Sequence, residues 1–111
     1  MQTRQQIDHI LHCLCDMYNS CDITCAEHHF APDITYDSMW VSSSMSGKAT
    51  VTFYLETKLE AMKTGGNKPK ARVLPEKPVL IIRQGAIEVA LVVDIRGGLI
   101  TNLSLIASEL I

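Results

Sequence analysis

The stretch that decides the fold is FAPDITYDS at Phe30–Ser38, followed across a run of serines by SGKA at Ser46–Ala49. Pro32 restricts the residue before it to an extended backbone. The β-branched and aromatic residues after it are typical of a strand, so we predict a strand over Ile34–Val41. The serine run is predicted to form a loop, and Ser46 is the expected N-cap of the helix behind it.

The chain before this stretch is predicted to be helical. Apolar residues recur every three or four positions, which predicts a helix from about Thr3 to Asn19. The residues of this stripe are Ile7, Ile10, Leu11, Leu14, Met17, Tyr18 and Cys21. Thr24 and Glu27 then form a capping-box pattern, which predicts a short second helix that ends by Pro32.

The chain after the stretch changes from helix to sheet. The helix that starts at Ser46 is expected to stop at Gly65 and Gly66. Its inward stripe consists of Val51, Tyr54, Leu55, Leu59 and Met62. No helical period follows, and the short breaks at Gln84-Gly85 and Gly97-Gly98 indicate hairpin turns of an antiparallel meander. Its strands are predicted at Arg72–Leu74, Val79–Arg83, Ile87–Ile95 and Leu99–Leu110.

The strand Ile87–Ile95 has two unlike faces. Every second residue from Ile87 is a large aliphatic, which predicts that this face covers the core. The opposite face combines Glu88 and Asp94 with apolar residues such as Ala90 and Val92. A partner subunit or a pocket is therefore expected against it.

Length and composition limit the function classes. The chain has 111 residues, 47% of them hydrophobic and 20% charged, so we expect one globular domain over residues 1–111. The formal charge is -2 and no basic run is present, which argues against nucleic acid as a partner. No run approaches the roughly 20 apolar residues of a membrane span. We expect no membrane partner and, without a signal-like start, a cytoplasmic location.

The order of these elements, together with Phe30–Ser38, Ser46–Ala49 and Phe53-Tyr54-Leu55, resembles the nuclear transport factor 2-like superfamily. The stretch is similar to its ketosteroid isomerase-like and SnoaL-like branch. The resemblance implies an α+β fold, a cone-shaped barrel of N-terminal helices packed on a curved, mainly antiparallel sheet. It also implies a largely apolar pocket inside the cone and a homodimer paired through the sheet.

The resemblance places unusual residues at the family's catalytic positions. Ser38 stands where ketosteroid isomerases carry the acid/base carboxylate, and an unaided serine hydroxyl is too weak a base. The oxyanion-binding tyrosine falls on Leu14, with Tyr18 one turn later, and the second acid falls near Ala90. Isomerisation by the family mechanism is therefore not expected, and whether the protein is an enzyme stays open.

Two other residues are candidate catalytic groups. Asp37 is the carboxylate beside Ser38, although strand alternation directs it away from the pocket unless a bulge intervenes. With Arg83 and Asp94 it would match the acid–arginine–acid set of the epoxide hydrolases, but isolated strand charges are more often structural. One of His28 and His29, at the end of the short second helix, is a candidate general base near neutral pH, with simple surface exposure as the alternative.

Aromatic and sulfur-containing residues supply the candidate ligand-binding set. Such side chains suit small, flat, mainly apolar molecules. The set consists of Tyr18, Tyr36, Ser38, Met39, Trp40 and Tyr54. Ordinary core packing is the alternative for the whole set, most strongly for Tyr54 on its helix stripe. For Trp40, next to the serine loop, a position at the pocket mouth is as well supported as core packing.

Histidines and cysteines crowd the first quarter of the chain. His9 and Cys13 lie four apart, as do His12 and Asp16, so each pair would share a helix face. No CxxC motif is present, so we expect no metal site and no cofactor. The four cysteines, all between Cys13 and Cys25, are expected to be reduced, with Cys21 and Cys25 as small buried hydrophobes.

Three functions follow from the sequence. The first is a dimeric protein that binds a small apolar molecule, with isomerase-like or lyase-like chemistry as its catalytic form. The second is a non-catalytic ligand-binding or protein-assembly module. The third is a metal or thiol sensor built on residues 13–29.

Overall fold

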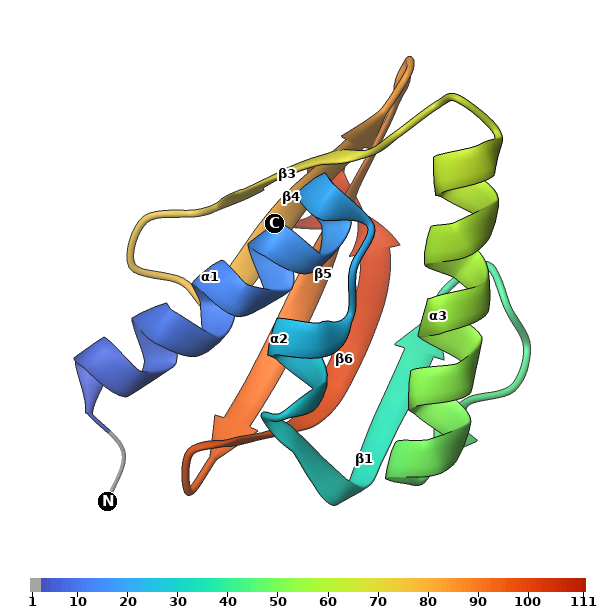
Figure 1. Ribbon diagram of the computed structural model, residues 1–111. Helices are drawn as coiled ribbons and strands as arrows, with labels where there is room; N and C mark the ends of the chain where they lie inside the picture. The colour runs from blue at the N-terminus through green and yellow to red at the C-terminus, as the bar shows by residue number, and fades with distance from the viewer. Residues whose placement is uncertain (1–2) are drawn as a thin grey trace.

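The computed structural model describes residues 3–111, in which helices pack against one curved sheet (Figure 1). The helical elements are α1 (Arg4–Ser20), α2 (Thr24–Glu27), α3 (Lys48–Thr64) and the 3-10 turn η1 (Ser108–Leu110). The strands are β1 (Phe30–Ser38), β2 (Met45–Ser46), β3 (Lys70–Val73), β4 (Val79–Gln84), β5 (Ile87–Arg96) and β6 (Leu99–Ala107). The predicted α+β class and the antiparallel C-terminal meander are confirmed.

The sheet has six strands in the order β2-β1-β6-β5-β4-β3. β1 runs parallel to β6, and every other neighbouring pair is antiparallel. Since β2 and β3 lie at opposite edges, the sheet is open and curved and does not close into the expected barrel. The register of β1 against β6 shifts between Phe30 and Thr35, where Pro32 cannot donate a ladder hydrogen bond.

The main core lies between the helices and one face of the sheet. Leu14, Leu55 and Leu91 are completely buried there, from α1, α3 and β5 respectively. The opposite face of the sheet carries a smaller apolar cluster around Val79, Ile81 and Ala90. The prediction that one face of β5 covers the core is confirmed at Leu91 and Val93 but is wrong at Ile87, which is 69% exposed. A partner subunit or pocket against the opposite face stays a prediction.

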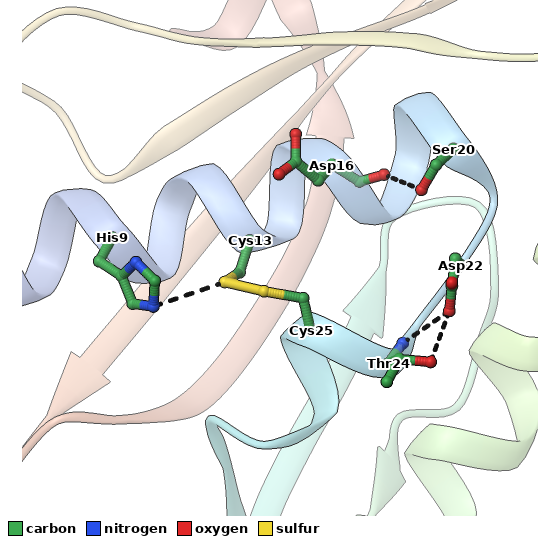
Figure 2. Close-up of a disulfide and its surroundings, with 7 residues drawn as sticks. All are labelled: His9, Cys13, Asp16, Ser20, Asp22, Thr24 and Cys25. Carbon is green, nitrogen blue, oxygen red and sulfur yellow. Dashed lines mark hydrogen bonds between the residues drawn. A yellow bond between two sulfur atoms is a disulfide. The ribbon is translucent and has the colours of Figure 1, made fainter.

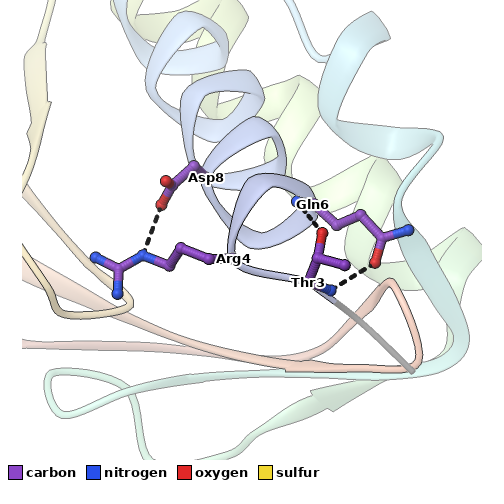
Figure 3. Close-up of polar contacts among 4 residues, drawn as sticks. All are labelled: Thr3, Arg4, Gln6 and Asp8. Carbon is purple, nitrogen blue, oxygen red and sulfur yellow. Dashed lines mark hydrogen bonds and ion pairs between the residues drawn. The ribbon is translucent and has the colours of Figure 1, made fainter.

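The start of α1 is fixed by local hydrogen bonds (Figure 3). The Thr3 hydroxyl accepts from the Gln6 backbone at 3.1 Å, and the Thr3 backbone donates to the Gln6 side chain at 2.8 Å, forming a capping box. Arg4 pairs with Asp8 one turn along at 3.4 Å. The first predicted helix therefore begins where its sequence indicates.

The end of α1 covers the edge strand β3. The Asn19 side chain accepts a hydrogen bond from the Ala71 backbone amide at 2.7 Å and donates to the Ala71 carbonyl at 3.1 Å. The Cys15 thiol donates to the same carbonyl at 3.0 Å. Burial raises the pKa of this thiol, so Cys15 stays protonated as a donor. These bonds occupy backbone groups that an edge strand would otherwise expose.

Two predicted caps and several strand boundaries are wrong. The predicted strand Ile34–Val41 ends at Ser38, and the predicted strand Leu99–Leu110 ends at Ala107. Thr24 is the first residue of α2 and not its N-cap, because the Asp22 carboxylate accepts both its backbone amide and its hydroxyl. Ser46 belongs to β2, and Gly47, with a positive φ of 94°, precedes α3. β1 begins at Phe30, four residues before the predicted start, because pairing with β6 extends it through Pro32.

The expectation of four reduced thiols is wrong for one pair. Cys13 and Cys25 form a disulfide between α1 and α2, shown in Figure 2, with their Cα atoms 5.5 Å apart. Cys25 is exposed and not the buried hydrophobe expected from its type. Cys15 and Cys21 are half-buried free thiols.

Candidate functional site

The main candidate site is a cavity of about 520 Å³ between α1, α3 and the curved sheet. Its volume lies within the range of small-molecule sites. Apolar side chains form most of its wall, namely Trp40, Met62, Ile82, Ile87, Val89, Leu105 and Ala107. The other lining residues are Tyr18, Lys58, Gln84, Glu88 and Glu109. The site is thus apolar with a few polar groups.

Tyr18 lines the cavity and carries an unpaired, buried hydroxyl. The side chain is only 2% exposed, because α1 directs it into the core beside Met17. Its hydroxyl has no hydrogen-bond partner among residues 3–111. An unpaired buried hydroxyl costs roughly 1–3 kcal/mol. A ligand oxygen in the cavity would remove that penalty.

Three tyrosines gather inside the fold. The rings of Tyr36 on β1 and Tyr54 on α3 lie 5.2 Å apart between centroids. Burial raises the pKa of the Tyr18 phenol, and the neighbouring phenols of Tyr36 and Tyr54 raise it further. Burial raises the pKa of Tyr36 as well, with Tyr54 adding to the effect. The hydroxyls of Tyr18 and Tyr36 are therefore neutral near pH 7, and Tyr18 can donate a hydrogen bond to a ligand.

Lys58 is the cationic group of the cavity wall. Burial lowers the pKa of its ammonium group, and no ion pair involves it among residues 3–111. Its Nζ lies 5.9 Å from the Tyr54 ring centroid, within cation–π range. A partly desolvated lysine attracts a carbonyl or carboxylate oxygen and releases a proton more readily than an exposed one.

The rim of the cavity is apolar but bears acidic side chains. Trp40 is 57% exposed and Ile87 is 69% exposed. Glu88 forms an ion pair with Arg83 across the β4–β5 hairpin at 3.3 Å, whereas Glu109 lies on the C-terminal turn. The rim thus brings two large apolar side chains into contact with water.

Only two residues of the predicted ligand-binding set line this cavity, Tyr18 and Trp40. Tyr36 and Tyr54 pack behind the wall, in or against the main core. Ser38 is half-buried at the end of β1, and its hydroxyl accepts a hydrogen bond from the Trp40 amide at 3.3 Å. Met39 is exposed, and its sulfur accepts a hydrogen bond from the Ala107 amide at 3.0 Å.

The two candidate catalytic residues lie outside the cavity wall. Asp37 is exposed on the face of β1 opposite Tyr36. With its amide nitrogen turned toward this strand, Asn102 donates to Asp37 Oδ2 at 3.1 Å. His28 is exposed at the end of α2. The cavity therefore gives no support to either residue as its acid or base.

Sequence reasoning missed Lys58 and the rim residues of the β4–β5 hairpin. Tyr54, Lys58 and Met62 follow each other at intervals of four on α3, so they share one face of the helix. That spacing was a usable signal for Lys58. Ile87 and Glu88 gave no such signal, because their place on the rim depends on how far the hairpin extends past the helices.

Among the described residues, no helix is both long and apolar enough to cross a membrane.

The chain is similar to known proteins in structure but not in sequence. No family model matches the chain, and no curated protein matches it. A SnoaL-like protein of unknown function from Burkholderia thailandensis is similar in structure, with a TM-score of 0.70 and 15% identity over 95% of this chain and 97% of that one. A "putative ketosteroid isomerase" from Kribbella flavida has a TM-score of 0.65 and 18% identity over 91% and 76%. An NTF2-like protein of unknown function from Cytophaga hutchinsonii has a TM-score of 0.58 and 15% identity over 95% and 88%.

Proposed function

We propose that this chain, which has the nuclear transport factor 2-like fold, binds a small, mainly apolar molecule bearing one carbonyl or carboxylate oxygen. The observation that carries the proposal is the unpaired, buried hydroxyl of Tyr18, a residue that lines a largely apolar cavity. A ligand oxygen there would accept a hydrogen bond from Tyr18 and lie on the same cavity wall as Lys58. The apolar part of the ligand would contact Met62, Val89 and Trp40.

The proposal concerns binding. If the protein also catalyses a reaction in this cavity, we propose Lys58 as the base. Isomerase-like or lyase-like chemistry needs a group that moves a proton beside a carbonyl. Ser38 and Asp37 lie outside the cavity wall, whereas Lys58 lies in it with a lowered pKa. A reaction in this cavity would therefore use the Lys58 amine as the base and the Tyr18 hydroxyl at the carbonyl oxygen.

Trp40 provides the test of binding, since it is the only tryptophan and lies on the cavity rim. We would titrate its fluorescence with a panel of apolar ketones and fatty acids. Saturable quenching by a few panel members is expected, and a flat response across the panel would contradict the proposal. Calorimetry with a Trp40→Phe variant checks that the signal reports binding.

Tyr18→Phe tests the observation itself. Loss of one hydrogen bond should weaken binding by roughly two- to tenfold, corresponding to about 0.5–1.5 kcal/mol. Tyr36→Phe is the matched control, because it removes a buried phenol that does not line the cavity. Equal effects of the two variants on affinity would show that Tyr18 has no special role.

A second candidate function, assembly through the sheet, has its own observation. The sheet face opposite the helices carries the small cluster of Val79, Ile81 and Ala90, against which Val92 and Ile106 pack half-buried. We propose that two copies pair through this face as a homodimer. Sedimentation equilibrium should give a dimer that Ile106→Glu converts to a monomer; a monomeric wild-type chain would refute this.

A further inference from the structure

Four potential metal ligands come from two helical segments that the sequence separates. His9 and Cys13 are four residues apart on α1, and Cys25 and His29 are four apart across α2 and the residues after it. The absence of a CxxC motif leads us to expect no metal site from the sequence, with a sensor on residues 13–29 only as the third function. The fold brings the two pairs together.

The distances among these side chains are short. Ligand atoms of His9, Cys13 and His29 all lie within 4.8 Å of one another, and the Cys25 sulfur is bonded to that of Cys13. His9 Nε2 lies 3.8 Å from the Cys13 sulfur, and the two imidazole rings meet edge to face with centroids 5.3 Å apart. Zinc bonds of about 2.0–2.3 Å in a tetrahedron place neighbouring ligand atoms roughly 3.5 Å apart.

The backbone around the site is held in place. Leu14 and Met17 anchor this part of α1 in the core. The His29 carbonyl accepts a hydrogen bond from Ile100 of β6 at 2.6 Å, and the His29 amide donates to Ala26 at 2.9 Å. Once the disulfide is reduced, the ligand side chains would rotate on this fixed backbone, and the exposed His9 and Cys25 leave a path for the ion.

We propose that the reduced chain binds one zinc ion through His9, Cys13, Cys25 and His29, and that the Cys13–Cys25 disulfide is the oxidised, metal-free form of the same site. Two thiolates and two imidazoles form a ligand set that zinc takes in structural sites. The bound ion would link α1 to α2 and the start of β1, as the disulfide does in the oxidised form. One site thus has two mutually exclusive cross-links.

The exchange between the two forms balances in electrons and protons. A dithiol reductant gives two electrons and two protons to the Cys13–Cys25 bond. Cys13 and Cys25 become thiols, and the reductant becomes a disulfide. Each thiol releases its proton when it binds zinc, and the imidazoles bind as neutral groups. The state of the site would follow the thiol redox balance of its surroundings.

The test uses cobalt as a spectroscopic substitute for zinc. Full-length protein is reduced with a phosphine, freed of metal under anaerobic conditions and titrated with Co²⁺. We expect one ion per chain, with intense visible bands typical of tetrahedral coordination and thiolate charge-transfer absorption. Zinc should displace the cobalt, and protein with the disulfide intact should give no such spectrum.

Each ligand has a matched control within the chain. Cys13→Ser and Cys25→Ser should each remove about half of the thiolate absorption, since two sulfurs bind the ion. His9→Ala and His29→Ala should weaken binding by more than the roughly 10–100-fold that loss of an outer-shell partner costs. The controls Cys15→Ser, His12→Ala and His28→Ala should leave the titration unchanged, because these side chains lie outside the cluster.

A measurement on the unmodified chain covers the case of a variant that does not fold. Zinc should protect Cys13 and Cys25 of the reduced protein from alkylation, while Cys15 and Cys21 react equally with and without the ion. Alkylation unaffected by zinc, or a reduced chain that gives no stoichiometric cobalt spectrum, would overturn the proposal. So would a spectrum that survives replacement of both Cys13 and Cys25.

Discussion

The side chains that join α1 to α2 and β3 differ in chemistry from those at the rim of the cavity. On the first side a disulfide and the side-chain hydrogen bonds of Asn19 and Cys15 hold neighbouring elements together. On the second side Trp40 and Ile87 leave most of their apolar surface in water. Polar and covalent links thus fix α1 to its neighbours, whereas the rim residues leave apolar surface open to contact.

The largest expected effect sharpens this contrast in packing. Leu14→Ala should lower the free energy of unfolding by about 2–5 kcal/mol, because Leu14 is completely buried between α1 and the sheet. Ile87→Ala on the rim should change it by less than about 0.5 kcal/mol, as expected for an exposed side chain. Urea unfolding measures both changes. Equal losses of stability would contradict the assignment of Leu14 to the packed core and Ile87 to the exposed rim.

The second effect concerns the covalent link. Reducing the Cys13–Cys25 disulfide in the presence of a chelator should lower the free energy of unfolding by up to about 3 kcal/mol, since it reopens a short loop in the unfolded chain. Urea curves with and without the phosphine measure the loss. Cys13→Ser combined with Cys25→Ser should be insensitive to the reductant, whereas Cys15→Ser should respond as the wild type does. A free energy of unfolding unchanged by reduction would show that the disulfide does not stabilise the packing of α1 on α2.

A smaller effect concerns the edge strand. Asn19→Ala should cost about 1 kcal/mol, because two hydrogen bonds to the Ala71 backbone are lost at an exposed position that water can partly satisfy. Hydrogen exchange of the Ala71 amide should accelerate more than that of amides in β5. Asn19→Asp keeps the acceptor and loses the donor, so its amide protection should be intermediate; exchange uniform across the sheet would contradict this assignment.

The predictable parts of the molecule were those with a periodic signal. The stripe of α1, the two-residue alternation of β5 and the glycines after α3 each report a local geometry, and each was located correctly. The predicted caps of α2 and α3 were wrong, because the choice between Ile23 and Thr24, or between Gly47 and Ser46, depends on how the chain enters the helix.

The candidate site was predictable only in part. Tyr18 and Trp40 were identified from residue type and position, and both line the cavity. The pairing of Cys13 with Cys25 was missed because it depends on how α2 folds back along α1, which no spacing within either helix encodes. Asp37 was proposed as a catalytic group because it is a carboxylate beside Ser38. Strand alternation, which already predicted an outward side chain, gave its position correctly.

The smallest effect is a pH dependence that separates the cavity from its surroundings. The pKa of Lys58 is lowered by burial from its ordinary value of 10.5. As pH rises above 7, the native chain loses this proton before the unfolded chain does, so stability contributed by this group rises with pH. Tyr18 and Tyr36 act in the opposite sense, because their pKa values are raised from 10.0 and the unfolded chain ionises first above that pH. The window for Lys58 therefore ends near pH 10.

Lys58→Met removes the titrating group while keeping most of the side-chain volume. The wild type should gain stability relative to this variant between pH 7 and pH 10, measured as the difference between their urea midpoints. Lys63→Met is the matched control on the same helix, since Lys63 is exposed and does not line the cavity. Parallel curves for the wild type and Lys58→Met would mean that the Lys58 ammonium group is as well hydrated as an exposed one. The cavity would then lose its base, and the Tyr18 hydroxyl alone would remain to orient a ligand oxygen.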